Sequence, residues 1–131
     1  MAEGLSATLV SNLLNTLRSA GAAFGPVATF VQLHTASPGA AGTTAVAAGS
    51  STRIAATLSA SSGGSALALS ADVGPWTNGG TSETLTHISV WTASSGGTFE
   101  LSIALSLSKP WASGDTFTLK TLGVGLTPQA A

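Results

Sequence analysis

The chain is poor in charged side chains, and it contains neither cysteine nor tyrosine. Among its 131 residues there are four Lys or Arg and five Asp or Glu, which gives a formal net charge of −1. A typical soluble domain is about a quarter charged, so Ser, Thr, Gly and Ala must form most of this surface. Without cysteine, disulfides and thiolate chemistry are excluded. So small a net charge gives little repulsion between copies, which suits a subunit packed against other subunits.

The chain also lacks a cluster of cations. Its basic residues are scattered: Arg18, Arg53, Lys109 and Lys120. Binding to nucleic acid needs clustered cations that neutralise phosphates, so we expect no nucleic-acid partner. Long hydrophobic runs are missing as well, because polar residues interrupt the N-terminal apolar stretch before it reaches the length of a bilayer. We therefore expect no membrane partner.

Near the N-terminus, apolar residues recur at helical spacing. The leucines among them recur at every fourth residue: Leu5, Leu9, Leu13 and Leu17. This period predicts an amphipathic helix over about residues 5–19. Such a helix must bury its apolar face, either on the sheet of its own domain or on a neighbouring subunit. We expect the first, because one short helix is marginally stable alone.

After Pro26 the apolar period changes to two, which is typical of strands. The alternation is cleanest in residues 98–108, where it predicts one buried face and one polar, solvated face. Further strands are expected at residues 27–34, 52–59, 65–71, 84–92 and 116–127. The apolar phase slips within the last of these, which predicts a bulge or bend near residues 121–123.

These elements predict a single domain over residues 1–131 with a mainly β fold. We expect an antiparallel β-sandwich of about seven strands over residues 27–127, preceded by the N-terminal amphipathic helix. Long loops are expected at residues 36–51 and 72–82. The first of them is uncharged and rich in Gly, Ala and Ser, so it should be mobile or ordered by contacts with another chain.

The candidate general bases are the two histidines, His34 and His87. Neither has acidic residues at a ligand-like spacing, so we expect no metal site, and each histidine should pack its ring and hydrogen-bond a strand neighbour. A small hydrolase is the enzymatic alternative, in which His87 would act with Glu83 or Asp115. The serines lack a Gly-x-Ser-x-Gly motif, and the Gly-Gly pairs lack the lysine of a phosphate-binding loop. We therefore expect no enzyme, no catalytic residue and no cofactor.

The tryptophans are Trp76, Trp91 and Trp111. They could stack on a sugar, as in a carbohydrate-binding module, or cover the edge of a small core or a subunit interface. Tryptophans near strand ends more often have the second role, and they are favoured at contact sites. We therefore favour core or interface roles over glycan binding.

Short segments along the chain occur in an order that is found in a known family. They are a leading Leu-rich helix, FVQLHTASPG at residues 30–39, a strand around Arg53, LTHISVW at residues 85–91, a Gly-Gly turn, GDTF at residues 114–117 and a closing Leu-rich strand. In this order the chain resembles small tailed-bacteriophage virion surface proteins, variously labelled tail-fibre-like, minor tail or head-decoration proteins. The resemblance implies a β-sandwich on the virion surface, assembled in the host cytoplasm, with no catalytic residues. The lack of tyrosine argues against a host-receptor role.

Our first hypothesis is a non-enzymatic virion structural protein that binds the major capsid protein on the outer face of the capsid, as a decoration or stabilising subunit. The alternative is a minor tail or tail-fibre component, with host-surface glycan binding as a further option. Small side chains lose little entropy on burial, and repetition on a symmetric particle multiplies weak contacts. Self-association through an exposed edge strand is also expected. The interface candidates are Trp76, Trp111, Pro38, Gly39, Val46 and Leu5.

Overall fold

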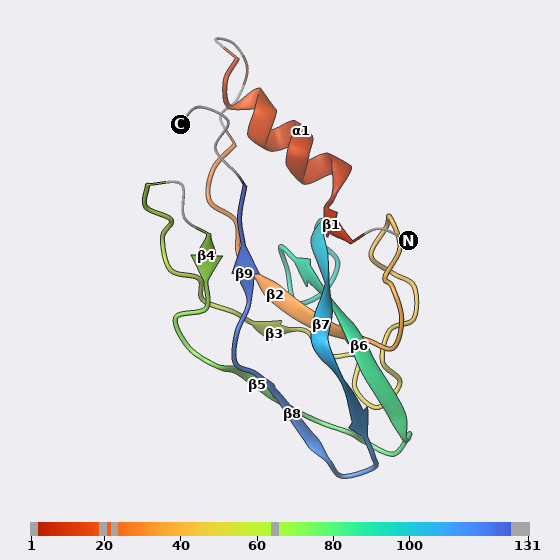
Figure 1. The fold of residues 1–131 in the computed structure, drawn as a ribbon. Coiled ribbons are helices and arrows are strands. Elements are labelled where there is room, and N and C mark those ends of the chain that lie inside the picture. Colours follow the sequence, from red (N-terminus) through yellow and green to blue (C-terminus); the bar gives the residue numbers. More distant parts are fainter. Residues whose placement is uncertain (1–2, 19–20, 22–23, 64–65, 127–131) are drawn as a thin grey trace.

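A computed structural model describes residues 3–18, 21, 24–63 and 66–126 of the chain (Figure 1). The elements in chain order are β1 (Gly4–Leu5), α1 (Ala7–Asn15), β2 (Phe30–His34), β3 (Ile54–Ala55), β4 (Leu67–Ala68), β5 (Val73–Thr77), β6 (Glu83–Trp91), β7 (Phe99–Trp111), β8 (Thr116–Leu119) and β9 (Gly123–Val124). A five-stranded sheet has the order β1-β7-β6-β2-β3, and two ribbons pair β4 with β9 and β5 with β8. All pairs are antiparallel, and the fold is the mainly β sandwich that the sequence predicts.

One hydrophobic core joins the five-stranded sheet to the two ribbons. The sheet contributes Val31 and Leu33 from the interior strand β2, and the β5-β8 ribbon contributes Trp76 and Leu119, all of them buried. The rings of Trp76 and Phe117 lie 6.0 Å apart across the β5-β8 ribbon. Bulky side chains at a few positions therefore fill a core in a chain whose composition is dominated by small residues.

The segment over residues 36–51 lies against the end of β2 in the same chain. The N–H of Ala47 donates to the carbonyl of Leu33 at 3.0 Å. The carboxylate of Glu83 accepts from the backbone N–H groups of residues 48 and 49, at 3.1 and 2.8 Å. The loop is thus ordered by contacts within its own chain, and it needs no neighbouring subunit for that purpose.

Helix α1 is shorter than the stripe of leucines suggests. Leu5 belongs to β1, where it pairs with Leu101, and the hydroxyl of Ser6 caps the helix by accepting from the N–H of Leu9 at 3.1 Å. The helix ends at Asn15, and residue 19 of the predicted range lies outside the described residues. No residue of α1 is fully buried, and Figure 1 shows the helix at one end of the molecule.

No helix in the described part of the chain is long and apolar enough to cross a membrane.

Strand β5 occupies part of residues 72–82, where the sequence predicts a loop. Its register with β8 shifts between Val73 and Trp76, and Gly74 and Pro75 lie at the shift. Proline is tolerated at such an irregularity because no ladder hydrogen bond is required of it there. The strand predicted over residues 116–127 is interrupted at the place where the apolar phase slips: β8 ends at Leu119, β9 begins at Gly123, and the two pair with different strands.

Strand β7 departs from the predicted alternation in two places. Glu100 and Ser102, which belong to the phase predicted to be solvated, are buried, because β1 and α1 contact this part of the strand. Further along, the register with β6 shifts so that residues 105–108 stand opposite Thr86 alone. In this bulge Leu107 is 81% exposed. The alternation of apolar and polar residues therefore predicts the strand, but the elements that pack on the strand decide which of its faces is buried.

Candidate interaction surface

The clearest polar cluster surrounds His34 on β2. Its Nδ1 lies 2.8 Å from the carbonyl oxygen of Thr44, and its Nε2 lies 2.7 Å from the hydroxyl of Ser89 on β6. A carbonyl can only accept, so Nδ1 carries the proton and Nε2 accepts from Ser89. The same hydroxyl accepts from the indole N–H of Trp91 at 2.8 Å. Burial lowers the pKa of His34, which keeps the imidazole neutral.

This pair of Ser89 and His34 has the contact of a nucleophile with its base, but both residues are fully buried. A carbonyl takes the place that a carboxylate occupies in a catalytic triad. A substrate therefore has no path to the serine, and the cluster satisfies the hydrogen bonds of buried groups. Its effect is to fix β2 against β6.

His87 stands opposite His34 in the register of β6 and β2, on a strand that also carries Glu83. Its Nε2 lies 3.6 Å from Oε1 of Glu3. The carboxylate of Glu83 is bound to residues 48 and 49, and that of Asp115 accepts from the N–H of Ala112. Neither proposed hydrolase partner of His87 is recorded in contact with it. Within the described ranges, no group of three His, Cys, Asp or Glu could hold a metal ion.

The tryptophans all lie in the interior of the molecule. Trp76 and Trp111 are each 1% exposed, and Trp91 is also buried. The indole N–H of Trp76 donates to the carbonyl of Thr52 at 2.8 Å. None of these rings presents a face on which a sugar could stack, so Trp76 and Trp111 act as core residues in this chain.

The other interface candidates lie in two separate places. Pro38 is buried, while Gly39 and Val46 are half-buried in the segment held against β2. Leu5 is half-buried at a different site, a groove beside α1. The structure therefore does not bring the predicted candidates together into one surface.

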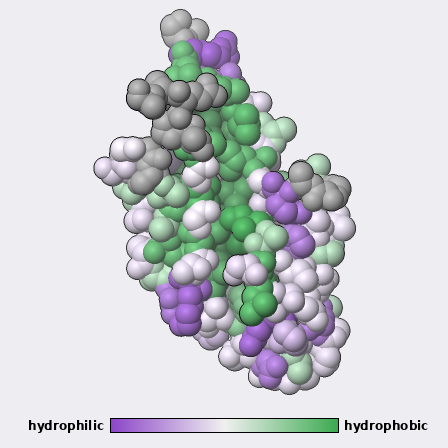
Figure 2. Space-filling model, in the orientation of Figure 1, coloured by the Kyte–Doolittle hydropathy of each residue, from purple (hydrophilic) through white to green (hydrophobic). Residues whose placement is uncertain are grey.

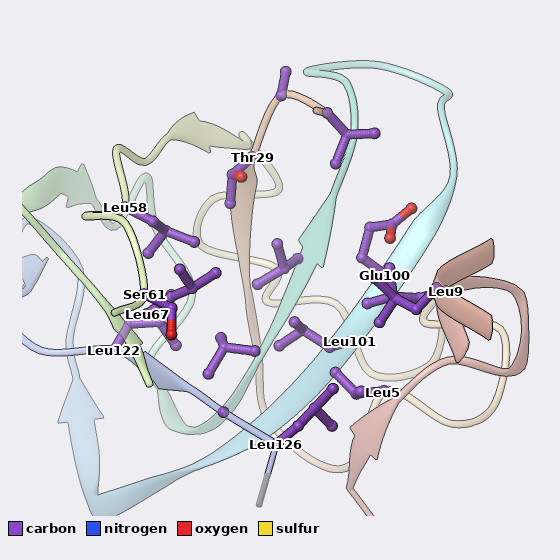
Figure 3. A pocket seen from close by; sticks show the side chains of 16 residues that line it. Leu5, Leu9, Thr29, Leu58, Ser61, Leu67, Glu100, Leu101, Leu122 and Leu126 are labelled. Carbon is purple, nitrogen blue, oxygen red and sulfur yellow. The ribbon is translucent and has the colours of Figure 1, made fainter. Parts of the chain in front are cut away.

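An apolar groove of about 420 Å³ runs between α1 and the β4-β9 ribbon. Figure 3 shows Leu5 and Leu9 on the helix side, facing Leu58 and Leu67 across the groove. Sequence reasoning found the leucines of one wall, but the groove itself depends on how the helix sits over the ribbon. Its remaining lining is also largely apolar: Leu13, Val27, Ala28, Thr29, Ser61, Val90, Leu101, Leu122, Val124, Gly125 and Leu126, with Glu100.

Glu100 is the one acidic residue in the described wall of this groove. Its side chain is 4% exposed, and its Oε2 is buried without a hydrogen-bond partner. Burial raises the pKa of this carboxyl above its ordinary value. An unpaired buried carboxyl oxygen is costly, because it has lost water without gaining a hydrogen-bond donor.

Large apolar side chains are also exposed around the groove. Leu14 and Leu17 on and just after α1 are 62% and 84% exposed, and Leu126 at the groove is 65% exposed. Figure 2 shows a band of apolar surface that runs from α1 across the middle of the face seen in Figure 1. Contiguous apolar surface of this kind marks interaction sites.

The described part of the chain is thus a β-sandwich with an open apolar groove on its surface and a histidine–serine cluster buried inside. Comparison with known families then identifies the family. Residues 4–127 match the family described as podophage GP4 fiber I protein gp80, and the chain belongs to this family. The predicted resemblance to phage virion surface proteins is thus confirmed, and the chain is a phage fibre- or tail-associated structural protein. No curated protein matches the chain.

Proposed function

We propose that the chain is a non-enzymatic structural subunit of a phage fibre, and that it acts by presenting an apolar surface to other subunits. The observation that carries this proposal is the family match, which spans residues 4–127 and therefore includes both α1 and the β4-β9 ribbon. The groove lies between these two elements. The region that defines the family thus contains the interaction surface.

The chemistry of the surface supports an assembly role. Four of the chain's 131 residues are basic and five are acidic, so long-range repulsion between subunits is weak. Burial of apolar surface is the main favourable term in association, and here it is available without removing many charges from water. A subunit of this kind contributes contacts to a particle rather than chemistry.

Decoration of the capsid is the second candidate. It was our first expectation from the sequence, and the abundance of small uncharged side chains supports it, because such side chains lose little entropy against a lattice. We place the fibre first because the family description names a fibre protein. Glycan binding through Trp76 or Trp111 is not part of the proposal, since both rings are buried.

Labelling of intact phage particles tests the proposal. Gold-conjugated antibodies against the purified chain should mark the fibres in electron micrographs, and particles from a phage that lacks the gene serve as the control. Label on the capsomers would replace the fibre with capsid decoration. Particles without label, from a stock in which the chain is absent by mass spectrometry, would contradict both locations.

A further inference from the structure

The apolar groove and the exposed end of α1 are complementary features of one chain. The groove offers an apolar space with a carboxyl group in its wall. Just outside it, the chain presents exposed leucines followed by a cation, as Leu14, Leu17 and Arg18. The groove could be filled by apolar side chains such as these leucines. The exposed leucines and the cation could in turn be covered by an apolar groove that carries an acidic group.

The charges of the two features also match. Arg18 is exposed, and among the described residues the ion pairs are Glu3 with His87 and Asp72 with Lys120. Arg18 therefore pairs with none of the described acidic side chains. Glu100 has a buried oxygen without a partner. A guanidinium satisfies a carboxylate better than any other side chain, because its donors form a planar fork.

We infer that a second copy of this chain fills the groove with the C-terminal end of its α1, inserting Leu14 and Leu17 and placing Arg18 against Glu100. The inference deepens the proposed structural role and rests on it. Leu9 and Leu13 of the same helix line the groove. In each copy the helix end that inserts therefore lies next to the groove that receives its partner. Two copies can therefore exchange helix ends reciprocally around a two-fold axis, which closes the assembly.

Two other parts of the chain combine a basic residue with apolar side chains, but they are less suited to fill the groove. Arg53 is occupied, because it donates to the carbonyls of Ala93 and Gly96 and lies 3.8 Å from the ring centre of Trp91. Leu107 and Lys109 are exposed on β7, beyond its pairing with β1. The helix is preferred because it adjoins the groove and buries no residue fully in its own chain.

Sedimentation equilibrium of the purified chain tests this contact directly. The wild type should associate, and Leu17→Asp should weaken the association by at least about tenfold, because it places a charge in an apolar contact. Leu107→Asp is the matched control, since Leu107 is 81% exposed and Leu17 84%. It should leave association within about twofold of the wild type. An equal loss in both variants, or a loss in Leu107→Asp alone, would place the contact elsewhere and overturn the inference.

The pairing of Arg18 with Glu100 is tested by a double-mutant cycle. Arg18→Gln and Glu100→Gln should each weaken association about tenfold, and the double variant should be little weaker than either single one. Effects that simply add would contradict the pairing. Ala28→Trp is an independent check that leaves both groups in place, because Ala28 lines the groove and is exposed. A bulky ring there should block association, and unchanged association would show that the groove is not the site.

A wild-type chain that stays monomeric up to about 1 mM would overturn the inference. That result would leave the fibre assignment standing, because labelling of particles measures it separately. Conversely, association of the purified chain together with its absence from particles would contradict the proposed function while supporting the contact. The two proposals therefore fail in distinguishable ways.

Discussion

Two regions of this molecule differ in whether their polar and apolar side chains find partners within the chain. Around β2 and β6, the buried polar groups of His34, Ser89 and Trp91 all have partners within the chain. Around α1, the apolar side chains of Leu14 and Leu17 remain in water, and Glu100 keeps an unpartnered oxygen. The three polar groups around β2 and β6 are therefore satisfied by folding alone. In the second region, apolar side chains stay exposed and a carboxyl oxygen has no partner among the described residues.

This contrast changes where the contacts of the protein are expected. From the sequence, the segment over residues 36–51 and the tryptophans are the natural interface candidates. In the structure the segment is bound by Glu83, and the tryptophans are buried. The exposed apolar surface lies instead beside the helix.

The largest expected difference between the two regions is in how much the free energy of unfolding falls when a leucine is truncated. Leu33→Ala removes a fully buried side chain next to the His34 cluster, and it should lower the free energy of unfolding by about 2–5 kcal/mol. Leu13→Ala in the groove wall should cost about 1 kcal/mol, because Leu13 is only half-buried. Urea denaturation measures both. Each change is made separately in the Leu17→Asp background, at concentrations where sedimentation shows a monomer, so that association does not contribute. Equal costs there would erase the contrast.

Acidification should lower the stability that the region around β2 and β6 contributes to the fold. Burial lowers the pKa of His34 below its usual 6.5 in the folded chain, so the unfolded state takes up a proton first as the pH falls. The stability that comes from this cluster is full above pH 6.5 and is lost progressively as the pH falls toward the folded pKa. Unfolding curves at several pH values should show this loss. His34→Gln, which cannot titrate, should be less stable at neutral pH but should lack that part of the pH dependence.

The stability contributed by the region around the groove should change with pH in the opposite direction. Burial raises the pKa of Glu100 above its usual 4.5, so the folded monomer holds this proton more tightly than the unfolded chain does. The carboxyl therefore costs stability above the folded pKa, and the cost disappears as the pH falls to 4.5. In the Leu17→Asp background, Glu100→Gln should be more stable than its parent near neutral pH, with a difference that shrinks on acidification. A constant or reversed difference would show that Glu100 is satisfied in the monomer.

Local patterns in the sequence predict most of the strands but not their covering. The slip in apolar phase near residues 121–123 coincides with the break between β8 and β9. The helix is predicted too long because the stripe includes Leu5, which the pairing with Leu101 draws into the sheet. Strand β5 is missed because Gly74 and Pro75 signal a turn, whereas pairing with β8 keeps the segment extended.

The candidate site depends even more on tertiary contacts. Glu100 lies in the polar phase of an alternating strand, and only the placement of β1 and α1 over that phase buries it. The signal that was available is in the helix. Leu14 stands beside Leu13, so the leucines occupy more of the helix surface than one stripe requires. A second apolar face of this kind indicates a second contact.

The smallest expected effect concerns Leu107, a strongly exposed leucine away from the groove. It lies in the bulge of β7, where residues 105–108 stand opposite Thr86 alone. Because its side chain is already 81% in water, Leu107→Ser should change the free energy of unfolding by less than about 0.5 kcal/mol. Thermal and urea unfolding of the variant measure this. A larger loss would mean that the bulge packs against the core. Exposure alone would then not be enough to distinguish the region around the groove from the region around β2 and β6.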